Sequence, residues 1–165
     1  AFEPRLRESG TRLEQELPDT PLPVTGDADQ LAQVVQNLLD NALKYGRPDG
    51  TMRLCVKRCE PGGRWPVRPG MLLSVSDQGQ GIPRQHLPRL TERFYRVDTG
   101  RSRALGGTGL GLAIVKHIVN RHRGQLLIES EEGRGTTVTV WLPAAPVTET
   151  RASSRSEGTG AADAA

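Results

Sequence analysis

Aromatic side chains are scarce in this chain, where Phe, Tyr and Trp together make up 4% of 165 residues. Surfaces that stack nucleic-acid bases interleave basic with aromatic residues, and no stretch of the sequence has that pattern, so we expect no nucleic-acid partner. The chain also lacks a run of about 18 apolar residues and a basic leader followed by an apolar segment, so we expect this piece neither to contact a membrane nor to be secreted. It begins with Ala1 rather than Met, which indicates a piece of a longer protein.

Cysteine is nearly absent, with only Cys55 and Cys59 in the chain. Both lie in a stretch that reads as a strand, where four residues span roughly 13 Å, too far for a disulfide. The spacing also lacks the second ligand pair of a zinc site. We expect two free thiols in a reducing compartment.

Basic charge is concentrated in one window, although the net charge is only +3. The chain has 19 arginines and three lysines, and six of the arginines lie between Arg84 and Arg103, where only Glu92 and Asp98 oppose them. Such a window attracts phosphate groups, nucleic acid or an acidic partner surface, and it is equally compatible with a solvated loop. The choice depends on the motifs around it.

The length predicts one globular unit, since domains average about 150 residues. Apolar residues at a spacing of three and four predict an amphipathic helix over 28–45 with Asp27 as its N-cap, and a second strong helix over 110–121. A short helical turn, or the tail of a preceding element, is expected at 2–9, and a further helix at about 85–92. Five strands are predicted, the second and third joined as a hairpin, at 11–17, 51–59, 71–76, 125–130 and 136–142.

Polar residues gather on one sector of the first long helix. At 100° per residue, Asn37, Asn41, Lys44 and Tyr45 face one place beside the apolar stripe. A carboxamide oxygen suits Mg²⁺, a lysine suits a phosphate, and a tyrosine ring can cover an aromatic base. Two asparagines on a helix are by themselves more often plain surface residues.

An aspartate follows the apolar strand at 71–76. Asp77 precedes Gly79 and Gly81, so its carboxylate is expected at the mouth of a sheet, where bare backbone lets a ligand come close. A carboxylate accepts hydrogen bonds and suits the exocyclic amine of adenine rather than the guanine carbonyl. An ordinary turn at this aspartate is about equally compatible with the sequence.

A glycine-rich stretch precedes the second long helix. Gly107, Gly109 and Gly111 are expected to offer backbone N–H groups and the positive helix end to phosphate oxygens. A dinucleotide-binding fingerprint is rejected because the third glycine comes one residue early and the preceding segment is a loop. The P-loop motif, which needs Gly-Lys-Ser or Gly-Lys-Thr, does not occur.

These blocks resemble those of one family. Residues 37–45 look like the N box, 77–81 like the first glycine box, 92–96 like the F box and 107–111 like the second glycine box of the catalytic ATP-binding domain of bacterial sensor histidine kinases. That family shares a superfamily with gyrase, MutL and large heat-shock chaperones. Further similarity at 111–119 and 133–136 extends the resemblance over roughly 20–143. Within the family, the sequence as a whole is most similar to the sensor kinases of the phosphate-regulon type.

The resemblance implies the Bergerat fold, an α/β two-layer sandwich in which a mixed β-sheet packs on helices. It implies an ATP-binding domain over 1–143 with a mobile lid at about 84–108. Residues 144–165 contain no aromatic residue and are dominated by small residues, which predicts a disordered tail. Thr91 departs from the family, which often has a large apolar residue there, so weaker packing of the lid is expected.

The resemblance also implies roles for individual residues. Asn41 would be the main Mg²⁺ ligand with Asn37 assisting, Lys44 would contact phosphate, and these three form the expected catalytic group. Tyr45 would cover the adenine and Asp77 would bind its amino group. The remaining expected nucleotide-binding residues are Gly79, Gly81, Ile82, Phe94, Tyr95, Arg96, Arg101, Arg103, Gly107, Thr108, Gly109, Leu110, Gly111 and Thr136.

The implied activity is transfer of the γ-phosphoryl group of ATP to a histidine on a separate dimerisation domain, with Mg²⁺ as cofactor. His86, His117 and His122 lack the acidic residue that commonly follows the acceptor, so none of them is expected to accept the phosphoryl group. The expected partners are the phosphoacceptor domain of a homodimeric parent kinase and a response regulator. The domain is expected in the cytoplasm, with the parent anchored in the cell membrane.

Two other functions remain open at this point. One is a module that binds nucleotide or a partner without catalysis. The other is a gyrase-like or chaperone-like ATPase, which is disfavoured because those relatives usually have a glutamate at the position of Asn37 to activate water.

Overall fold

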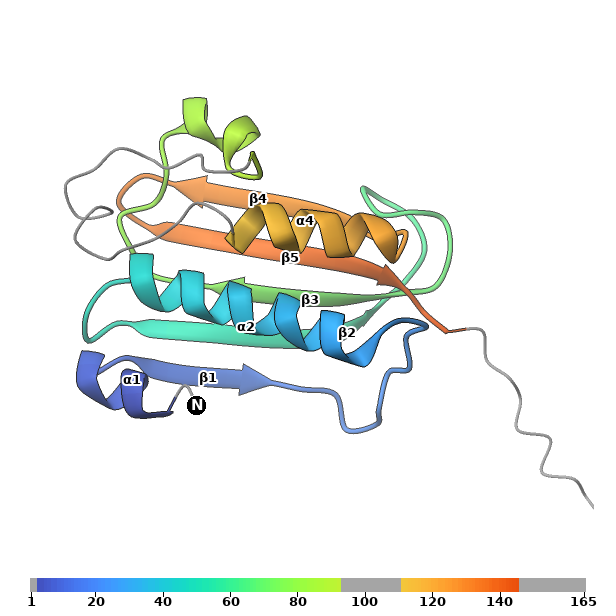
Figure 1. Cartoon of the computed structure of the whole chain (residues 1–165), viewed down its shortest axis with the longest axis horizontal. Helices are drawn as coiled ribbons and strands as arrows, with labels where there is room; N and C mark the ends of the chain where they lie inside the picture. The colour runs from blue at the N-terminus through green and yellow to red at the C-terminus, as the bar shows by residue number, and fades with distance from the viewer. Residues whose placement is uncertain (1–2, 93–110, 146–165) are drawn as a thin grey trace, which may run out of the picture.

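The computed structural model describes residues 3–92 and 111–145. Within these ranges one mixed sheet holds five strands in the order β1-β2-β3-β5-β4 (Figure 1). The strands are β1 (Arg12–Glu16), β2 (Thr51–Cys59), β3 (Gly70–Ser76), β4 (Gln125–Glu131) and β5 (Gly135–Pro143). Helices α2 (Ala28–Tyr45) and α4 (Gly111–Arg121) cover one face, and the short helix α1 (Glu3–Ser9) lies near β1. The predicted α/β two-layer sandwich with a mixed sheet is confirmed.

The chain connectivity brings three segments to one end of the sheet. β2 and β3 form the predicted antiparallel hairpin, β5 pairs antiparallel with both β3 and β4, and β1 lies parallel to β2. A parallel pair needs a crossover connection, and α2 provides it. The end of α2, the end of β3 and the β4–β5 turn therefore meet at the end of the sheet where β2 begins (Figure 1).

The apolar stripes of α2 and α4 pack on one face of the sheet to form the core. The α2 helix begins as predicted, because a carboxylate oxygen of Asp27 accepts the N–H groups of Asp29 and Gln30 at 2.9 and 3.1 Å. Alternate strand residues point into this core, as the pleat requires. The buried core residues are Val34, Leu38, Leu39, Ala42, Met52, Leu73, Val75, Val115, Ile118, Val119, Val138, Val140 and Leu142.

Trp141 is a large buried side chain on the opposite face of the sheet. Trp141 alternates with Val140 and Leu142 of the core, so it points away from the helices, yet its exposed fraction is 0%. The guanidinium of Arg68, from the β2–β3 connection, lies 5.6 Å from the Trp141 ring centroid. Both cysteines of β2 are free, as their spacing predicts.

One predicted helix is present but shorter, and it is not an α-helix. A helix was expected over about 85–92, and the structure has a 3₁₀ helix, η1 (Arg84–Arg89), that contains Pro88. Proline has no N–H to donate and its ring clashes with the carbonyl four residues earlier, so an α-helix cannot continue through it. The second long helix starts at Gly111, and Leu110 lies outside the described residues.

Hydrogen-bonded backbone extends two residues past the predicted boundary at 143. The N–H of Ala144 donates to Pro69 O at 3.0 Å, and the N–H of Ala145 donates to Pro23 O at 2.9 Å. The tail was predicted over 144–165, and its residues 146–165 lie outside the described part of the chain. Of the helices that the structure describes, none has the length and apolar character needed to cross a membrane.

Gly70→Ala should destabilise the domain. A Cβ at Gly70 would lie 2.1 Å from Nε1 of the buried Trp141, and overpacking of this kind costs about 1–3 kcal/mol. Gly111→Ala is the control, because a Cβ there meets no heavy atom of residues 3–92 or 111–145 within 4 Å. Urea unfolding of both variants measures the effect, and a Gly70→Ala protein as stable as the control would show that the ring moves at no cost.

Candidate functional site

Asp77 stands directly after β3, at the end of the sheet where α2 also ends. Its backbone N–H donates to Thr136 O at 2.9 Å. Its carboxylate Oδ1 accepts the N–H of Gly79 at 2.8 Å. These two bonds fix both the main chain and the side chain of Asp77, so the carboxylate has one defined orientation.

Three glycines let the loop after Asp77 pack against neighbouring backbone. A Cβ at Gly79 would lie 2.1 Å from Tyr45 O at the end of α2. A Cβ at Gly81 would lie 2.1 Å from Glu131 O, and one at Gly135 would lie 2.1 Å from Asp77 O. Gly81 and Gly135 also have φ values of +71° and +130°, which side chains disfavour. Among the described residues, the close approach expected at Gly79 and Gly81 is to the protein's own backbone.

Ser130 joins this loop to the β4–β5 turn. Its Oγ donates to Gly135 O at 3.0 Å and accepts the N–H of Ile82 at 2.7 Å. Because the single hydroxyl hydrogen of Ser130 is used on Gly135, Oγ1 of Thr136 must donate to Ser130 Oγ across their 2.8 Å contact. All four groups are therefore locked in one network.

Ser130 was missed by the sequence analysis, although a signal for it exists. It stands two residues after Ile128, a residue that packs on the core, so strand alternation places it on the helix-facing side. A hydroxyl on that side needs hydrogen-bond partners when buried.

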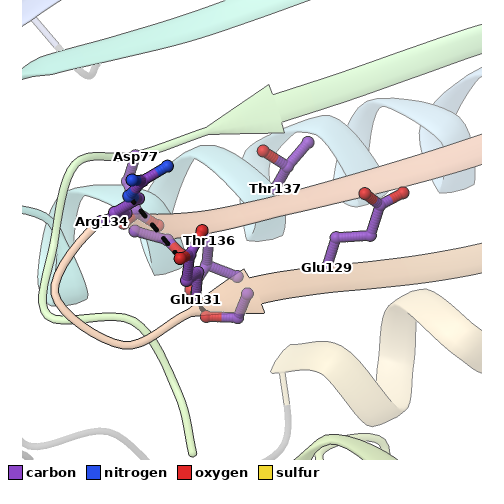
Figure 2. A pocket seen from close by; sticks show the side chains of 8 residues that line it. Asp77, Glu129, Glu131, Arg134, Thr136 and Thr137 are labelled. Atoms are coloured by element: carbon purple, nitrogen blue, oxygen red, sulfur yellow. Dashed lines mark hydrogen bonds and ion pairs between the residues drawn. The ribbon is translucent and has the colours of Figure 1, made fainter. Parts of the chain in front are cut away.

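A cavity of about 350 Å³ opens beside Asp77. This volume falls within the range of about 300–1,000 Å³ for small-molecule sites. Figure 2 shows Asp77 and Thr136 near the β4–β5 turn. In this turn Nε of Arg134 lies 3.6 Å from Oε1 of Glu131. The described residues that line the cavity are Asp77, Glu129, Ser130, Glu131, Arg134, Gly135, Thr136 and Thr137.

The expected residues of α2 lie on the other side of the Asp77 loop. Tyr45 touches that loop through its carbonyl oxygen, with Asn41 about one helical turn earlier and Asn37 about two. The amide nitrogen of Asn37 is buried and has no hydrogen-bond partner among the described residues. Of the described lining residues, none belongs to α2, so the structure links the α2 group to Asp77 through the loop and not through this cavity.

Lys44 already has a partner. Its Nζ lies 3.1 Å from Oδ2 of Asp40, one turn earlier on α2. A phosphate that binds Lys44 must therefore share this cation with Asp40.

Much of the expected phosphate-binding group lies outside the described residues. Gly111 is the exception, because it begins α4. The residues whose positions are not described are Phe94, Tyr95, Arg96, Arg101, Arg103, Gly107, Thr108, Gly109 and Leu110.

At the base of the predicted lid, Thr91 makes a polar contact. Nζ of Lys116, on α4, donates to Thr91 Oγ1 at 3.4 Å. A hydroxyl contact stands here in place of the apolar packing that a larger side chain would give.

His122 has a structural role at the far end of α2. Its Nε2 accepts the N–H of Asp27 at 3.1 Å, so Nδ1 carries the hydrogen and donates to Ile118 O at 2.7 Å. A Cβ at Gly26 would lie 2.4 Å from the His122 ring, so the ring packs on bare backbone. Both ring nitrogens are engaged, as expected for a packing histidine.

Burial raises the pKa of Asp77 above its ordinary value of 3.8, while hydrogen bonds from the backbone of Gly79 and Thr136 oppose the rise. The ionised carboxylate is thus incompletely compensated within the domain. A ligand that donates a hydrogen bond to the Asp77 carboxylate supplies the remaining compensation for its lost hydration.

Asp77→Asn should stabilise the isolated domain at neutral pH. The folded state holds the proton of Asp77 more tightly than the unfolded chain does, because the pKa of Asp77 is raised in the folded state. The contribution of Asp77 to the free energy of unfolding is therefore fully present below pH 3.8 and is lost as the pH rises through the raised pKa. The variant should match the parent near pH 4 and exceed it in unfolding free energy at pH 7, by urea denaturation. Asp19→Asn, at an exposed loop position, should show no such trend. A parent more stable than Asp77→Asn at pH 7 would contradict the raised pKa.

Comparison with known proteins identifies the family. Residues 26–146 match the family model described as histidine kinase-, DNA gyrase B-, and HSP90-like ATPase. The chain is 41% identical over 137 residues to the sensor histidine kinase WalK of Bacillus subtilis, which is 83% of this chain and 21% of that protein. It is 46% identical over 124 residues to the phosphate regulon sensor protein PhoR of Pseudomonas aeruginosa, 75% of this chain and 26% of that protein.

A solved structure agrees with these relatives. The mycobacterial sensor histidine kinase MprB superposes with a TM-score of 0.69 at 34% identity, covering 87% of this chain and 89% of that chain. The chain spans only about a fifth to a quarter of the two curated relatives. It belongs to the histidine kinase-, DNA gyrase B- and HSP90-like ATPase family and, within that family, to the ATPase domains of sensor histidine kinases.

Proposed function

We propose that this domain binds Mg²⁺-ATP and donates the γ-phosphoryl group to a histidine on a separate dimerisation and phosphoacceptor domain. The observation that carries the proposal is the Asp77 carboxylate, held by the N–H of Gly79 and desolvated enough to raise its pKa, at the end of the sheet where α2 also ends. Family membership supports ATP as the nucleotide.

The carboxylate selects adenine by its hydrogen-bond polarity. The exocyclic amine of adenine donates, whereas guanine presents a carbonyl oxygen at the equivalent place, and two acceptors facing each other in a partly dry site repel. Thr136 supports the same end of the base, since its backbone oxygen holds the Asp77 N–H and its hydroxyl is held by Ser130. Tyr45 covers the base from the end of α2.

The asparagines of α2 hold the phosphate end. The buried amide nitrogen of Asn37 has no partner among the described residues and needs a hydrogen-bond acceptor, and a phosphate oxygen meets that need. Mg²⁺ takes oxygen ligands and usually keeps several waters, so the amide oxygens of Asn41 and Asn37 fit it as its few protein ligands. When bound, Mg²⁺ neutralises charge on the phosphates.

The transfer itself needs positioning more than protein chemistry. A ring nitrogen of the acceptor histidine forms the N–P bond while the bond from the γ-phosphorus to the bridging oxygen breaks and ADP leaves. This chain holds the nucleotide in line, with Lys44 at the phosphates, and the acceptor domain brings the nucleophile. The arginines Arg96, Arg101 and Arg103 and the glycines Gly107, Gly109 and Gly111 are proposed to complete the phosphate contacts.

We propose further that the whole protein is a homodimeric, membrane-anchored sensor kinase that passes the phosphoryl group to a response regulator. The support is that both curated relatives are named as sensor proteins and are several times longer than this chain. Hydrolysis of ATP by the isolated domain should be weak, because Asn37 is neutral and cannot take a proton from water.

Asp77→Asn should weaken ATP binding by about 10- to 100-fold, since a hydrogen bond to a charged group contributes about 1.5–3 kcal/mol. The parent should bind ATP in preference to GTP, and the variant should lose much of that preference. Calorimetry with both nucleotides and Mg²⁺ measures this, with Asp19→Asn as the control. A parent that binds neither nucleotide, or a variant that binds ATP equally well, would contradict the assignment.

Asn41→Ala should reduce phosphotransfer by at least about tenfold, because the charge on the reacting phosphates is then less well stabilised. The assay mixes the domain with the phosphoacceptor domain of its parent and radiolabelled ATP, and counts acid-labile phosphohistidine. Gln36→Ala is the matched control, an amide removed from an exposed position of the same helix. A parent domain that binds ATP but yields no phosphohistidine would favour the non-catalytic module.

A further inference from the structure

A carboxylate on α2 is held between two cations from different helices. Oδ2 of Asp40 lies 3.1 Å from Nζ of Lys44, and Oδ1 of Asp40 pairs with the guanidinium of Arg5 on α1. Each oxygen of the carboxylate therefore serves one cation. Asp40 and Lys44 are one helical turn apart, whereas Arg5 is 35 residues away in sequence.

Helix α1 is fixed to the part of the chain where α2 ends. Leu6 packs against the core, and the carbonyl oxygen of Ser9 accepts the N–H of Asp49 at 3.1 Å, just after α2. A Cβ at Gly10, the residue after α1, would lie 2.1 Å from Oδ1 of Asp49, so the chain at this point packs against the α2–β2 connection. Arg5, which pairs with Asp40, thus belongs to a helix docked on the rest of the domain.

The three groups are charged and partly dry. The exposed fractions of the side chains are 43% for Arg5, 31% for Asp40 and 28% for Lys44. Burial by itself raises the pKa of Asp40, but the hydrogen bonds and charges of Arg5 and Lys44 lower it below its ordinary value. At neutral pH a single negative charge is therefore shared by two positive ones.

We propose that Asp40 is a positioning residue for Lys44 and that Arg5 sets how strongly Asp40 holds it, so that α1 tunes the affinity of the site for the phosphates of the nucleotide. With Arg5 in place, part of the charge of Asp40 is neutralised, and Lys44 is oriented but free to share its charge with a phosphate. Without Arg5, the carboxylate acts on Lys44 alone and competes with the phosphate. This inference rests on the proposed function of Lys44 as a phosphate contact.

A double-mutant cycle of Arg5→Gln and Asp40→Asn tests this mechanism. Affinity is measured for ATP and, by competition, for adenosine, which has no phosphate. Arg5→Gln should weaken ATP about two- to fivefold, the size expected for a partly exposed ion pair, and leave adenosine unchanged. In the Asp40→Asn background Arg5→Gln should have no effect, because the route through Asp40 is gone. Additive effects, or equal effects on ATP and adenosine, would overturn the proposal.

Two further variants guard against trivial causes. Arg5→Lys keeps the charge and should keep ATP affinity near that of the parent, and failure to do so while Arg5→Gln weakens binding would overturn a charge mechanism. Arg53→Gln removes an arginine from another ion pair, 2.7 Å from Glu16, and should leave ATP affinity unchanged. A loss as large as that of Arg5→Gln would show a general charge effect and overturn the proposal.

The failure of this inference is distinguishable from failure of the proposed function. If the parent does not bind ATP, or binds it equally well as Asp77→Asn, the proposed function falls and this inference falls with it. If ATP binding depends on Asp77 but the cycle is additive, only the inference about Arg5 and Asp40 is overturned. Urea unfolding of every variant confirms that the compared proteins are folded.

Discussion

Close approach of backbone to backbone around Asp77 is the constraint on which the candidate site depends. The loop after β3 lies between the end of α2 and the β4–β5 turn, and Gly79, Gly81 and Gly135 are the points of contact. A side chain at any of the three would push apart two elements that supply site residues. The glycines therefore act first as spacers, and this packing is what holds the carboxylate of Asp77 in one place.

The half-buried carboxylate of Asp77 illustrates how a ligand site is arranged at a cost to the fold. Asp77 is desolvated enough to raise its pKa, and only two backbone hydrogen bonds oppose that rise. The hydroxyl of Ser130 meanwhile donates to Gly135 O and accepts from the N–H of Ile82 and from Thr136. The hydroxyl that positions the loop is thus fully engaged within the protein, while the carboxylate that would meet the base can still accept a hydrogen bond. Such a division favours binding over stability.

Much of the fold was predictable because its signals are local. The helices α2 and α4 follow from apolar spacing, the start of α2 from Asp27, and the hairpin from two apolar runs around a loop rich in proline and glycine. The helix expected over about 85–92 is a 3₁₀ helix over 84–89, because Pro88 cannot donate the backbone hydrogen bond of an α-helix. Asp77 and Thr136 were predicted as site residues and line one cavity, whereas Ser130 was overlooked because a single serine in a strand has no distinctive spacing.

The sequence alone determined the elements, their order and the identity of the chemically distinctive blocks, since periodicity and glycine placement act over a few residues of chain. Only the tertiary structure decided which distant groups meet: Arg5 with Asp40, Arg68 with Trp141, and Ser130 with the loop after Asp77. In the sequence, these three pairs lie 35, 73 and 48 positions apart, in that order. Their formation depends on how the sheet and helices pack, which no local pattern of residues specifies.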